Sequence, residues 1–539
     1  MNTRSVILVC GLLSSLLAGG TAADTVSHIT IDTDRSVNCA SIKSIVADVT
    51  QGCKTDREKA IALYNFVVRT VWMPYVYGHP HEIIDGRLQQ IREPLKIINV
   101  YGAIGCDTQA KIFCTLLAEA GIESRLLDPG FAHGSNEVKW DGRWHWLDVW
   151  LPCYLTDENG RIYSYDELMA DRSLIGRAIE AGRVSDNFMF NPKPDTETIV
   201  KAGPHRPSEP GAGVVRCAWH ENLSLRPGES CTWLWDFVDK WYWPGEKFAF
   251  PACKFTRNEN CKQAFGYWEP YKKTLKGGPH PWYDVYYRYY GNAIFETNVL
   301  LTKEGLGTLG AKVRDGDFVA EGGVRNTAGT DMATIDIDFV LPYVIADSEI
   351  TGVAETHGSA ADGGGSVSVL FSVDGGRTWL LGGEVRGDGA FEPIRIGRPN
   401  VREYPAGSTS GQYRYSLRLV LRPSWRKEPT VLRSLKVTNW TMLNFYSRPW
   451  LEAGSNRITV TADAETFLTP PPLKVTWRWV ENWRDAPAEK TFSHSVARSG
   501  ATAVIEVGGD QRPRMKSVRI ERPVRRAVDV TDSPTPSSD

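Results

Sequence analysis

The spacing of apolar residues changes along the chain, and this change limits the fold more than any other feature. Residues 55–71 and 105–120 carry apolar side chains at helical spacing, and the first of these segments opens with a capping box of Thr55 and Glu58. Beyond residue 213 the pattern becomes short alternating runs between Gly and Asp turns, which is typical of β-sandwiches. The sequence therefore predicts a multidomain fold, with an N-terminal α+β domain followed by all-β sandwich-like modules.

The chain begins with a segment that has the form of an export signal. Arg4 supplies a positive charge, residues 6–17 are apolar, and residues 21–23 are small. No later run approaches the roughly 18 apolar residues that a membrane helix needs, so we expect no membrane span and a secreted or periplasmic location. The 62 Lys and Arg residues are balanced by 64 Asp and Glu residues, which argues against a nucleic-acid partner. The sequence makes no prediction of the oligomeric state.

At about 150 residues per domain, 539 residues predict several domains. The expected boundaries are 1–23 for the signal peptide, 24–200 for the α+β domain, 201–345 for an aromatic-rich β domain, 346–445 and 446–530 for two β-sandwiches, and 531–539 for a disordered tail.

The cysteine count is odd once Cys10 is removed with the signal. In an oxidising compartment at least one of the nine remaining thiols must then stay free, pair between chains or do chemistry. Closeness in sequence suggests three disulfides, although it cannot fix the connectivity. These are Cys39 with Cys53, Cys217 with Cys231, and Cys253 with Cys261, which leaves Cys106, Cys114 and Cys153.

Cys106 stands where the second predicted helix begins, directly after a glycine turn. Backbone N–H groups at a helix N-terminus stabilise an anion, so we expect a larger thiolate fraction at this position. The same N–H groups could bind the oxyanion of an acyl intermediate. A cysteine that opens a helix can equally be a small buried residue.

A hairpin with Asp141-Gly142 as its turn is predicted after this helix. The turn pairs Trp140 with Arg143, and the same register makes His133 and Asp148 diagonal neighbours on one face. There the imidazole could accept a thiol proton while the carboxylate holds the other ring N–H. A slip of one residue would break this arrangement.

These residues together resemble the transglutaminase-like superfamily of papain-type thiol enzymes. The resemblance is carried by Gly105-Cys106, by the run His-Gly-Ser-Asn-Glu-Val at 133–138, by Asp-Gly-Arg-Trp at 141–144 and by Leu147-Asp148. It covers about residues 39–165 and implies an α+β papain-type domain. It also implies that Cys106 is the nucleophile, His133 the base and Asp148 the residue that orients the base.

The rest of the pocket is less defined, because Ser135 stands where family members often have an aromatic residue. Candidates for a second oxyanion donor or a pocket wall are Tyr101, Gln109, Ser135 and Glu137. Gln109 can also be an ordinary polar residue of the helix, and Glu137 a structural hydrogen-bond partner. No CxxC or HExxH spacing concentrates metal ligands, and we expect no cofactor.

Residues 231–290 hold 19 aromatic side chains, far above the 11% of the whole chain. Exposed aromatic rings stack on sugars, which makes Trp241, Trp243, Trp268 and Trp282 a candidate glycan platform. The same rings could fill a sandwich core or the contact with the catalytic domain. Residues 372–379 resemble a single sialidase-type Asp-box, which is a turn motif without a catalytic group.

The favoured hypothesis is an exported thiol-dependent acyl-transfer enzyme, which works by amide hydrolysis or transamidation through a Cys106 thioester. Its substrate would be an amide in a protein, a peptide or a polysaccharide-linked group. The alternative is a non-catalytic secreted glycan- or protein-binding protein that retains the fold. A third possibility is a sugar-cleaving enzyme with a carboxylate pair among the aromatic residues.

Overall fold

The computed structural model describes residues 25–71, 80–84, 87–128, 133–185, 206–235, 238, 240–242, 291–359, 361–399, 407–463, 472–483 and 485–524. Several predictions fall outside these residues. They are the export signal at 1–23, the tail at 531–539, the pairing of Cys253 with Cys261, and the platform residues Trp243, Trp268 and Trp282.

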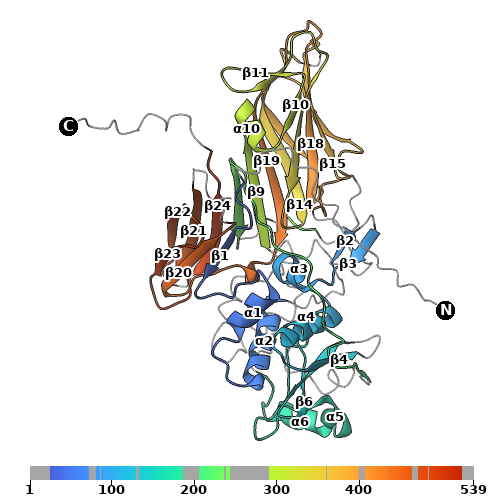
Figure 1. Cartoon of the computed structure of the whole chain (residues 1–539), viewed down its shortest axis with the longest axis vertical. Coiled ribbons are helices and arrows are strands. Elements are labelled where there is room, and N and C mark those ends of the chain that lie inside the picture. The colour runs from blue at the N-terminus through green and yellow to red at the C-terminus, as the bar shows by residue number, and fades with distance from the viewer. Residues whose placement is uncertain are drawn as a thin grey trace, which may run out of the picture.

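Helices form most of the N-terminal part, at the lower end of the molecule in Figure 1. They are α1 (Ile42–Val49), α2 (Asp56–Thr70), α3 (Pro94–Lys96), the π-helix η2 (Ile97–Tyr101), α4 (Cys106–Glu119), α5 (Tyr165–Ala170) and α6 (Ser173–Glu180). The predicted capping box is present in α2, where Thr55 and Glu58 each accept a backbone N–H of the other residue.

Two small sheets accompany these helices. A hairpin joins β2 (His81–Ile84) to β3 (Arg87–Gln90), and a four-stranded antiparallel sheet has the order β6-β5-β4-β7. Its strands are β4 (Ser124–Asp128), β5 (Ser135–Trp140), β6 (Arg143–Leu147) and β7 (Arg206–Pro207). Helix α4 packs against β4 and β5 and therefore lies beside this sheet.

The rest of the described chain is almost entirely β-structure. A five-stranded sheet has the order β10-β13-β18-β15-β16, and a three-stranded sheet has the order β1-β20-β23. A ten-stranded sheet follows the path β11-β12-β19-β9-β8-β24-β21-β22, and off this path β14 pairs with β19 while β17 pairs with β14. The strands are β1 (Thr30–Thr33), β8 (Glu229–Leu234), β9 (Gly291–Val299), β10 (Lys312–Arg314), β11 (Gly316–Phe318), β12 (Val324–Asn326), β13 (Ala333–Val340), β14 (Ile345–Glu355), β15 (Ser366–Ser372), β16 (Leu380–Val385), β17 (Gly389–Arg395), β18 (Arg414–Arg422), β19 (Val431–Leu443), β20 (Gly454–Thr461), β21 (Leu473–Glu481), β22 (Ala488–Val496), β23 (Ala501–Val507) and β24 (Arg514–Glu521), with the short helices α10 (Lys303–Thr308) and η4 (Phe445–Ser447).

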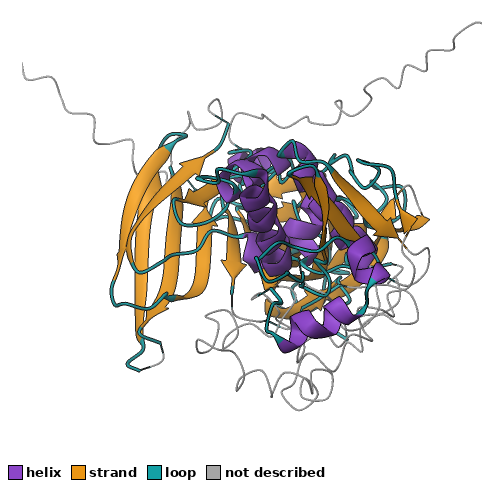
Figure 2. Cartoon of the chain, turned by 90° about the horizontal axis from the view of Figure 1, so that it is seen from below, coloured by secondary structure: helices purple, strands orange, loops and turns teal. Residues whose placement is uncertain are grey.

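The predicted order of α+β structure followed by β-structure is confirmed, and the alternating runs correspond to strands. In β13 and β21, for example, buried and exposed side chains alternate along the strand. The large sheet joins strands from all three segments that were predicted as β modules, because β9, β19 and β24 belong to it. Seen from below, the helices gather beside these layers of strands (Figure 2).

The N-terminal part and the β region share one hydrophobic core. Buried residues of this core include Leu63 of α2 and Ile98 of η2 as well as Val437 of β19. Strand β1 also pairs with β20, which lies more than four hundred residues further along the chain. Among the described residues, no helix is long and apolar enough to cross a membrane.

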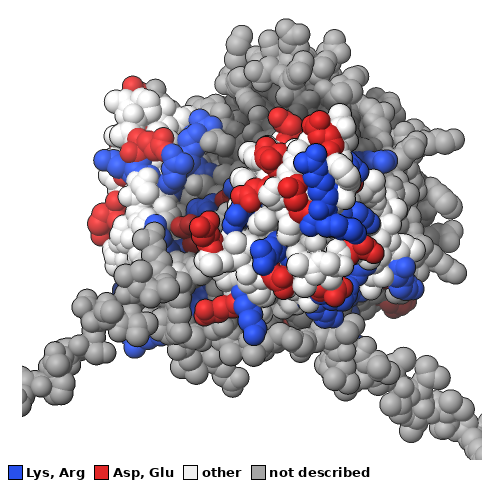
Figure 3. Space-filling view, turned by 90° about the horizontal axis from the view of Figure 1, so that it is seen from above, with Lys and Arg blue, Asp and Glu red and all other residues white. Residues whose placement is uncertain are grey.

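The surface of the β region carries intermixed charges. The face seen from above shows acidic and basic side chains interspersed (Figure 3). Arg314 pairs with Asp336 at 2.7 Å, and Lys427 pairs with Asp331 at 3.0 Å. This distribution agrees with the balanced composition of the chain.

The disulfides suggested within the described residues are not formed. Cys39, Cys53, Cys217 and Cys231 are all free thiols. The Cys39 thiol donates to the carbonyl of Val37 at 3.6 Å, and Cys231 is enclosed in β8 between β9 and β24. Closeness in sequence was therefore a poor guide to disulfides among the described cysteines.

Candidate active site

Cys106 is the first residue of α4, as the sequence predicted, and it is half-exposed. The N-cap is Gly105, which has an extended backbone and offers no side chain to cap the helix. The first N–H groups of a helix have no partner within the helix, and they carry the positive end of its dipole. The Cys106 sulfur therefore lies where an anion is stabilised.

Gly134 brings the segment that contains His133, just before β5, against this helix end. A Cβ atom at Gly134 would lie 3.0 Å from Cα of Asp107 and 3.3 Å from its backbone nitrogen. Both neighbours are backbone atoms, so a larger residue would push the strand away from α4. This role was not predicted from the sequence, although a glycine next to a candidate base is a usable sign of close approach.

The β5–β6 hairpin has the predicted register. Trp140 pairs with Arg143, and the pairing continues to Asn136 and Leu147. The turn residues Asp141 and Gly142 have φ angles of 51° and 73°, the left-handed conformation of a type I′ turn.

This register brings His133 and Asp148 together. Nε2 of His133 lies 2.5 Å from Oδ2 of Asp148, and both side chains are buried. The other carboxylate oxygen, Oδ1, accepts the backbone N–H groups of Trp150 at 2.9 Å and Leu151 at 2.7 Å. Both oxygens of the Asp148 carboxylate are therefore held by contacts, and the carboxylate orients the imidazole.

The other ring nitrogen of His133, Nδ1, is buried and has no hydrogen-bond partner among the described side chains. Burial alone would lower the pKa of His133. The Asp148 carboxylate, its hydrogen bond to the ring and the Cys106 side chain together outweigh burial and raise the pKa to about 10. The three side chains predicted from the sequence thus interact, with His133 between acid and thiol.

Trp150, which the predicted hairpin register places opposite His133, is a neighbour of the base. Its ring lies 5.0 Å from the His133 ring at a 50° tilt. Its indole N–H is buried and finds no acceptor among the described residues. Trp150 belongs to the turn that holds the Asp148 carboxylate, because its backbone N–H donates to that carboxylate.

Tyr101 and Gln109 are already engaged elsewhere. The Tyr101 hydroxyl donates to Glu82 at 2.7 Å. The side-chain amide of Gln109 donates to the carbonyls of Val71 at 2.7 Å and Val149 at 3.1 Å. In this conformation neither side chain is directed to serve as an oxyanion donor, because both have other acceptors.

Ser135 and Glu137 also have structural partners. The Ser135 hydroxyl accepts the indole N–H of Trp146 at 3.0 Å. Glu137 is fully buried, forms two hydrogen bonds with the Arg125 guanidinium at 2.6 and 2.9 Å, and accepts the backbone N–H of Tyr165. Glu137 thus holds β4, β5 and α5 together.

Burial makes five other described thiols harder to ionise. Burial raises the pKa of Cys39 and Cys217 to about 12 and that of Cys114 to about 11. Burial also raises the pKa of Cys153 and Cys231 well above the ordinary value. The described part of the chain holds no group of three or more His, Cys, Asp or Glu side chains that could bind a metal ion.

The described part of the candidate glycan platform is buried. Trp241 is only 4% exposed and belongs to the hydrophobic core, so it cannot stack on a sugar in this conformation. A separate cavity of about 580 Å³ lies in the β region. Its lining includes Phe391, Arg433 and Lys436 but no Asp, Glu, His or Cys, so it offers no carboxylate pair.

The predicted Asp-box segment forms the turn between β15 and β16. The Asp374 carboxylate accepts the backbone N–H groups of Arg377 and Thr378, both at 3.0 Å, and the Ser372 hydroxyl at 2.8 Å. The guanidinium of Arg418 lies 3.9 Å from the centre of the Trp379 ring. These contacts stabilise the hairpin, while the likeness to sialidase turns stays a prediction.

Comparison with known proteins identifies the N-terminal part. A family model described as the transglutaminase-like superfamily matches residues 43–164, which confirms the resemblance carried by the motifs around Cys106, His133 and Asp148. No curated protein matches the chain. Among solved structures, the pilus backbone RrgB from Streptococcus pneumoniae is 12% identical over 39% of this chain and 49% of that one, with a TM-score of 0.10. The chain thus spans about half the length of that protein, and a TM-score this low does not establish a shared fold.

Proposed function

We propose that the transglutaminase-like domain at residues 43–164 is the catalytic part of a thiol-dependent acyl-transfer enzyme. Cys106 is the nucleophile, His133 the general base and acid, and Asp148 the residue that orients the imidazole. The observation that carries the proposal is the position of His133. Its Nε2 is held 2.5 Å from Asp148, while its Nδ1 is buried without a partner among the described side chains.

The raised pKa of His133, about 10, supports a reactive ion pair. At neutral pH an imidazole with this pKa carries a proton, and an imidazolium beside a thiol favours the thiolate. The N-terminus of α4 favours the same anion. The proton on His133 and the positive N-terminus of α4 therefore both support a thiolate–imidazolium pair of Cys106 and His133 in the resting enzyme.

The reaction follows from this pair. The Cys106 thiolate attacks an amide carbonyl, and a C–S bond forms as the carbonyl electrons move to oxygen. The C–N bond then breaks, and the His133 proton passes to the leaving amine. Water or a second amine attacks the thioester and loses its proton to His133. The C–S bond breaks, which releases an acid or a new amide and restores the thiolate.

We assign the stabilisation of the negative oxygen of the intermediates to two groups. The first-turn N–H groups of α4 lie at the sulfur, where an oxyanion would form. The buried indole N–H of Trp150 lies on the His133 side of the site. Trp150 thus replaces Tyr101 and Gln109 as the candidate second donor.

The substrate is an amide in a protein, a peptide or a polysaccharide-linked group, and the enzyme works outside the cytoplasm after export. Hydrolysis is favoured over transamidation, because water is the abundant acceptor there. Ammonia release from a glutamine-rich protein reports formation of the thioester in either reaction, and incorporation of a fluorescent primary amine distinguishes the two. A fluorescent product bound to the protein would identify transamidation.

The test of the proposal needs no knowledge of the substrate. The folded chain is alkylated with iodoacetamide between pH 5 and 9, and each cysteine is followed by peptide mass mapping. Cys53, a half-exposed free thiol in the same domain, is the internal control. At pH 6 we expect Cys106 to react at least about tenfold faster than Cys53, because an ordinary thiol with a pKa near 8.5 is only about 0.3% ionised there.

The variant His133→Gln should remove this advantage of Cys106 and leave the rate at Cys53 unchanged. If Cys106 in the wild-type chain reacts no faster than Cys53 at pH 6, the enzyme proposal is wrong. The chain would then be a binding protein that retains the fold.

A further inference from the structure

A short segment of the β region enters the helical domain. It follows β19 and contains Asn444 and the helix η4 (Phe445–Ser447). Asn444, Phe445, Tyr446 and Arg448 are all buried. This segment contacts α2 and η2, so it connects the two parts of the molecule.

Asn444 joins the ends of two helices. Its side-chain Nδ2 donates to the carbonyl of Thr70 at 2.8 Å and to the carbonyl of Ile98 at 2.6 Å. Its backbone N–H donates to the carbonyl of Asn99 at 3.0 Å. Thr70 is the last residue of α2, and Ile98 and Asn99 lie in η2. Carbonyls near a helix end need partners from outside the helix, and one asparagine supplies them here.

The end of α2 supports the candidate site through Gln109. Val71, which follows Thr70, accepts the side-chain amide of Gln109, a residue one turn after Cys106 in α4. The same amide donates to the carbonyl of Val149, next to Asp148. Through Gln109, the end of α2 is therefore linked both to the helix that carries the nucleophile and to the turn next to the acid. Asn444 holds this end of α2 in place.

The second helix end leads directly into the nucleophile. The C-cap of η2 is Gly102, whose φ angle of 66° reverses the chain and whose N–H donates to the carbonyl of Ile97 at 2.8 Å. Only Ala103, Ile104 and Gly105 separate this turn from Cys106. A shift of η2 would therefore move the start of α4.

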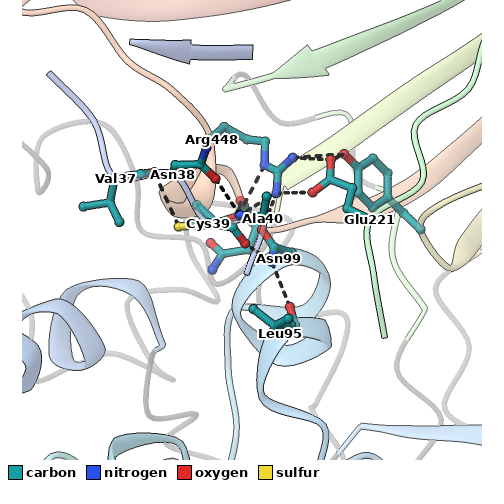
Figure 4. Close-up of polar contacts among 11 residues, drawn as sticks. Val37, Asn38, Cys39, Ala40, Leu95, Asn99, Glu221 and Arg448 are labelled. Carbon is teal, nitrogen blue, oxygen red and sulfur yellow. Dashed lines mark hydrogen bonds and ion pairs between the residues drawn. The ribbon is translucent and has the colours of Figure 1, made fainter. Parts of the chain in front are cut away.

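A buried ion pair fixes the same segment (Figure 4). The guanidinium of Arg448 donates to Glu221 at 2.6 and 2.9 Å and also to the side-chain oxygen of Asn99. The Asn99 amide in turn donates to the carbonyls of Cys39 at 3.0 Å and Leu95 at 2.9 Å. The contact of the segment with η2 is thus held at both Asn444 and Asn99.

From these contacts we infer that Asn444 is a positioning residue for the Cys106 site, and that the β region is required for the reactivity of the thiol domain. The inference rests on the proposed function. Asn444 touches none of the reacting groups. It acts by fixing the ends of α2 and η2, on which the position of α4 depends.

The variant Asn444→Asp tests this inference with almost no change of shape. The aspartate keeps an oxygen that can accept the backbone N–H of Tyr446, but it cannot donate to Thr70 and Ile98. We expect the alkylation rate of Cys106 at pH 6 to fall about tenfold, and the pH profile of its alkylation to move toward that of an ordinary thiol. The rate at Cys53 should not change.

Asn439→Asp is the matched control. Asn439 is also buried and lies in β19, but its side chain accepts hydrogen bonds from Ser348 and Tyr415 within the β region. We expect this variant to lower the melting temperature without altering the Cys106 profile. If Asn444→Asp fails to fold, Asn444→Ala, which adds no charge, takes its place.

The outcomes separate this inference from the proposed function. An ordinary Cys106 profile in the wild-type chain would end the proposed function. A perturbed wild-type profile that Asn444→Asp and Asn444→Ala leave unchanged, with only a loss of melting temperature, would show that Asn444 is merely structural. A slower alkylation of Cys106 that occurs in the Asn444 variants and not in Asn439→Asp supports the positioning role.

Discussion

Replacement of Asp148 by Asn is the most direct perturbation of the candidate site. The amide has the size of the carboxylate, and its oxygen can still accept the N–H groups of Trp150 and Leu151 that Oδ1 accepts. Its NH₂ group, however, must face Nε2 of His133, which has to become an acceptor. The single ring proton then sits on Nδ1, and the imidazole can no longer take a proton from Cys106.

The size of the effect of Asp148→Asn follows from the pKa of His133. With the carboxylate removed, burial is the main remaining influence, and the pKa should fall from about 10 to below its ordinary 6.5. That change corresponds to about 5 kcal/mol of lost stabilisation of the imidazolium, at about 1.36 kcal/mol per pKa unit. We expect turnover of an amide substrate to fall by about 10³ to 10⁴, because the helix N-terminus and substrate binding still contribute in the variant.

Alkylation by iodoacetamide measures the effect without a substrate. At pH 6 the rate at Cys106 in Asp148→Asn should fall between about 10- and 100-fold, since the loss of thiolate is partly offset by the greater nucleophilicity of a more basic thiol. Asp157→Asn is the matched control. Asp157 accepts the N–H groups of Asn159 and Arg161, each at 2.9 Å, in a turn outside the site.

The free energy of unfolding should also depend on pH through the protonation of His133. The folded-state pKa of His133 is raised above the unfolded value of 6.5, so its proton stabilises the fold fully below pH 6.5. This contribution is lost as the pH rises through about 10. The gap in unfolding free energy between wild type and Asp148→Asn, measured with urea, should therefore narrow by up to about 5 kcal/mol between pH 6.5 and 10. A constant gap together with an unchanged Cys106 profile would refute the reasoning.

Two further variants and one control separate the geometry of the site from the stability of the domain. Gly134→Ala adds a Cβ that would lie 3.0 Å from the Asp107 backbone, and we expect about a tenfold lower alkylation rate of Cys106 at pH 6. Gly307→Ala, where the added Cβ meets nothing within 4 Å, should leave that rate unchanged. Glu137→Gln weakens a buried ion pair with Arg125, and urea unfolding should show a loss of about 3 kcal/mol. The Cys106 profile of the folded Glu137→Gln protein should match wild type, and a loss of reactivity would instead assign Glu137 to the site.

The sequence by itself determined the local parts of the candidate site. The capping box and apolar spacing of α2 are local, and so is the glycine turn that ends before Cys106. The register of the hairpin was also predictable. Asp141 and Gly142 adopt left-handed backbone angles, and this turn sets the hairpin register that predicted His133 and Asp148 on one face.

The tertiary structure decided everything that depends on contacts between distant segments. Sequence closeness suggested disulfides for Cys39 and Cys231, but the fold leaves both as buried thiols. The fold also brings the Tyr101 hydroxyl to Glu82, whose carboxylate accepts the hydroxyl of Tyr413 from the β region as well. It also placed Asn444 against Thr70, across 374 residues of chain. Such contacts leave no periodic or turn signal, because they arise only when whole surfaces pack and their buried polar groups find partners.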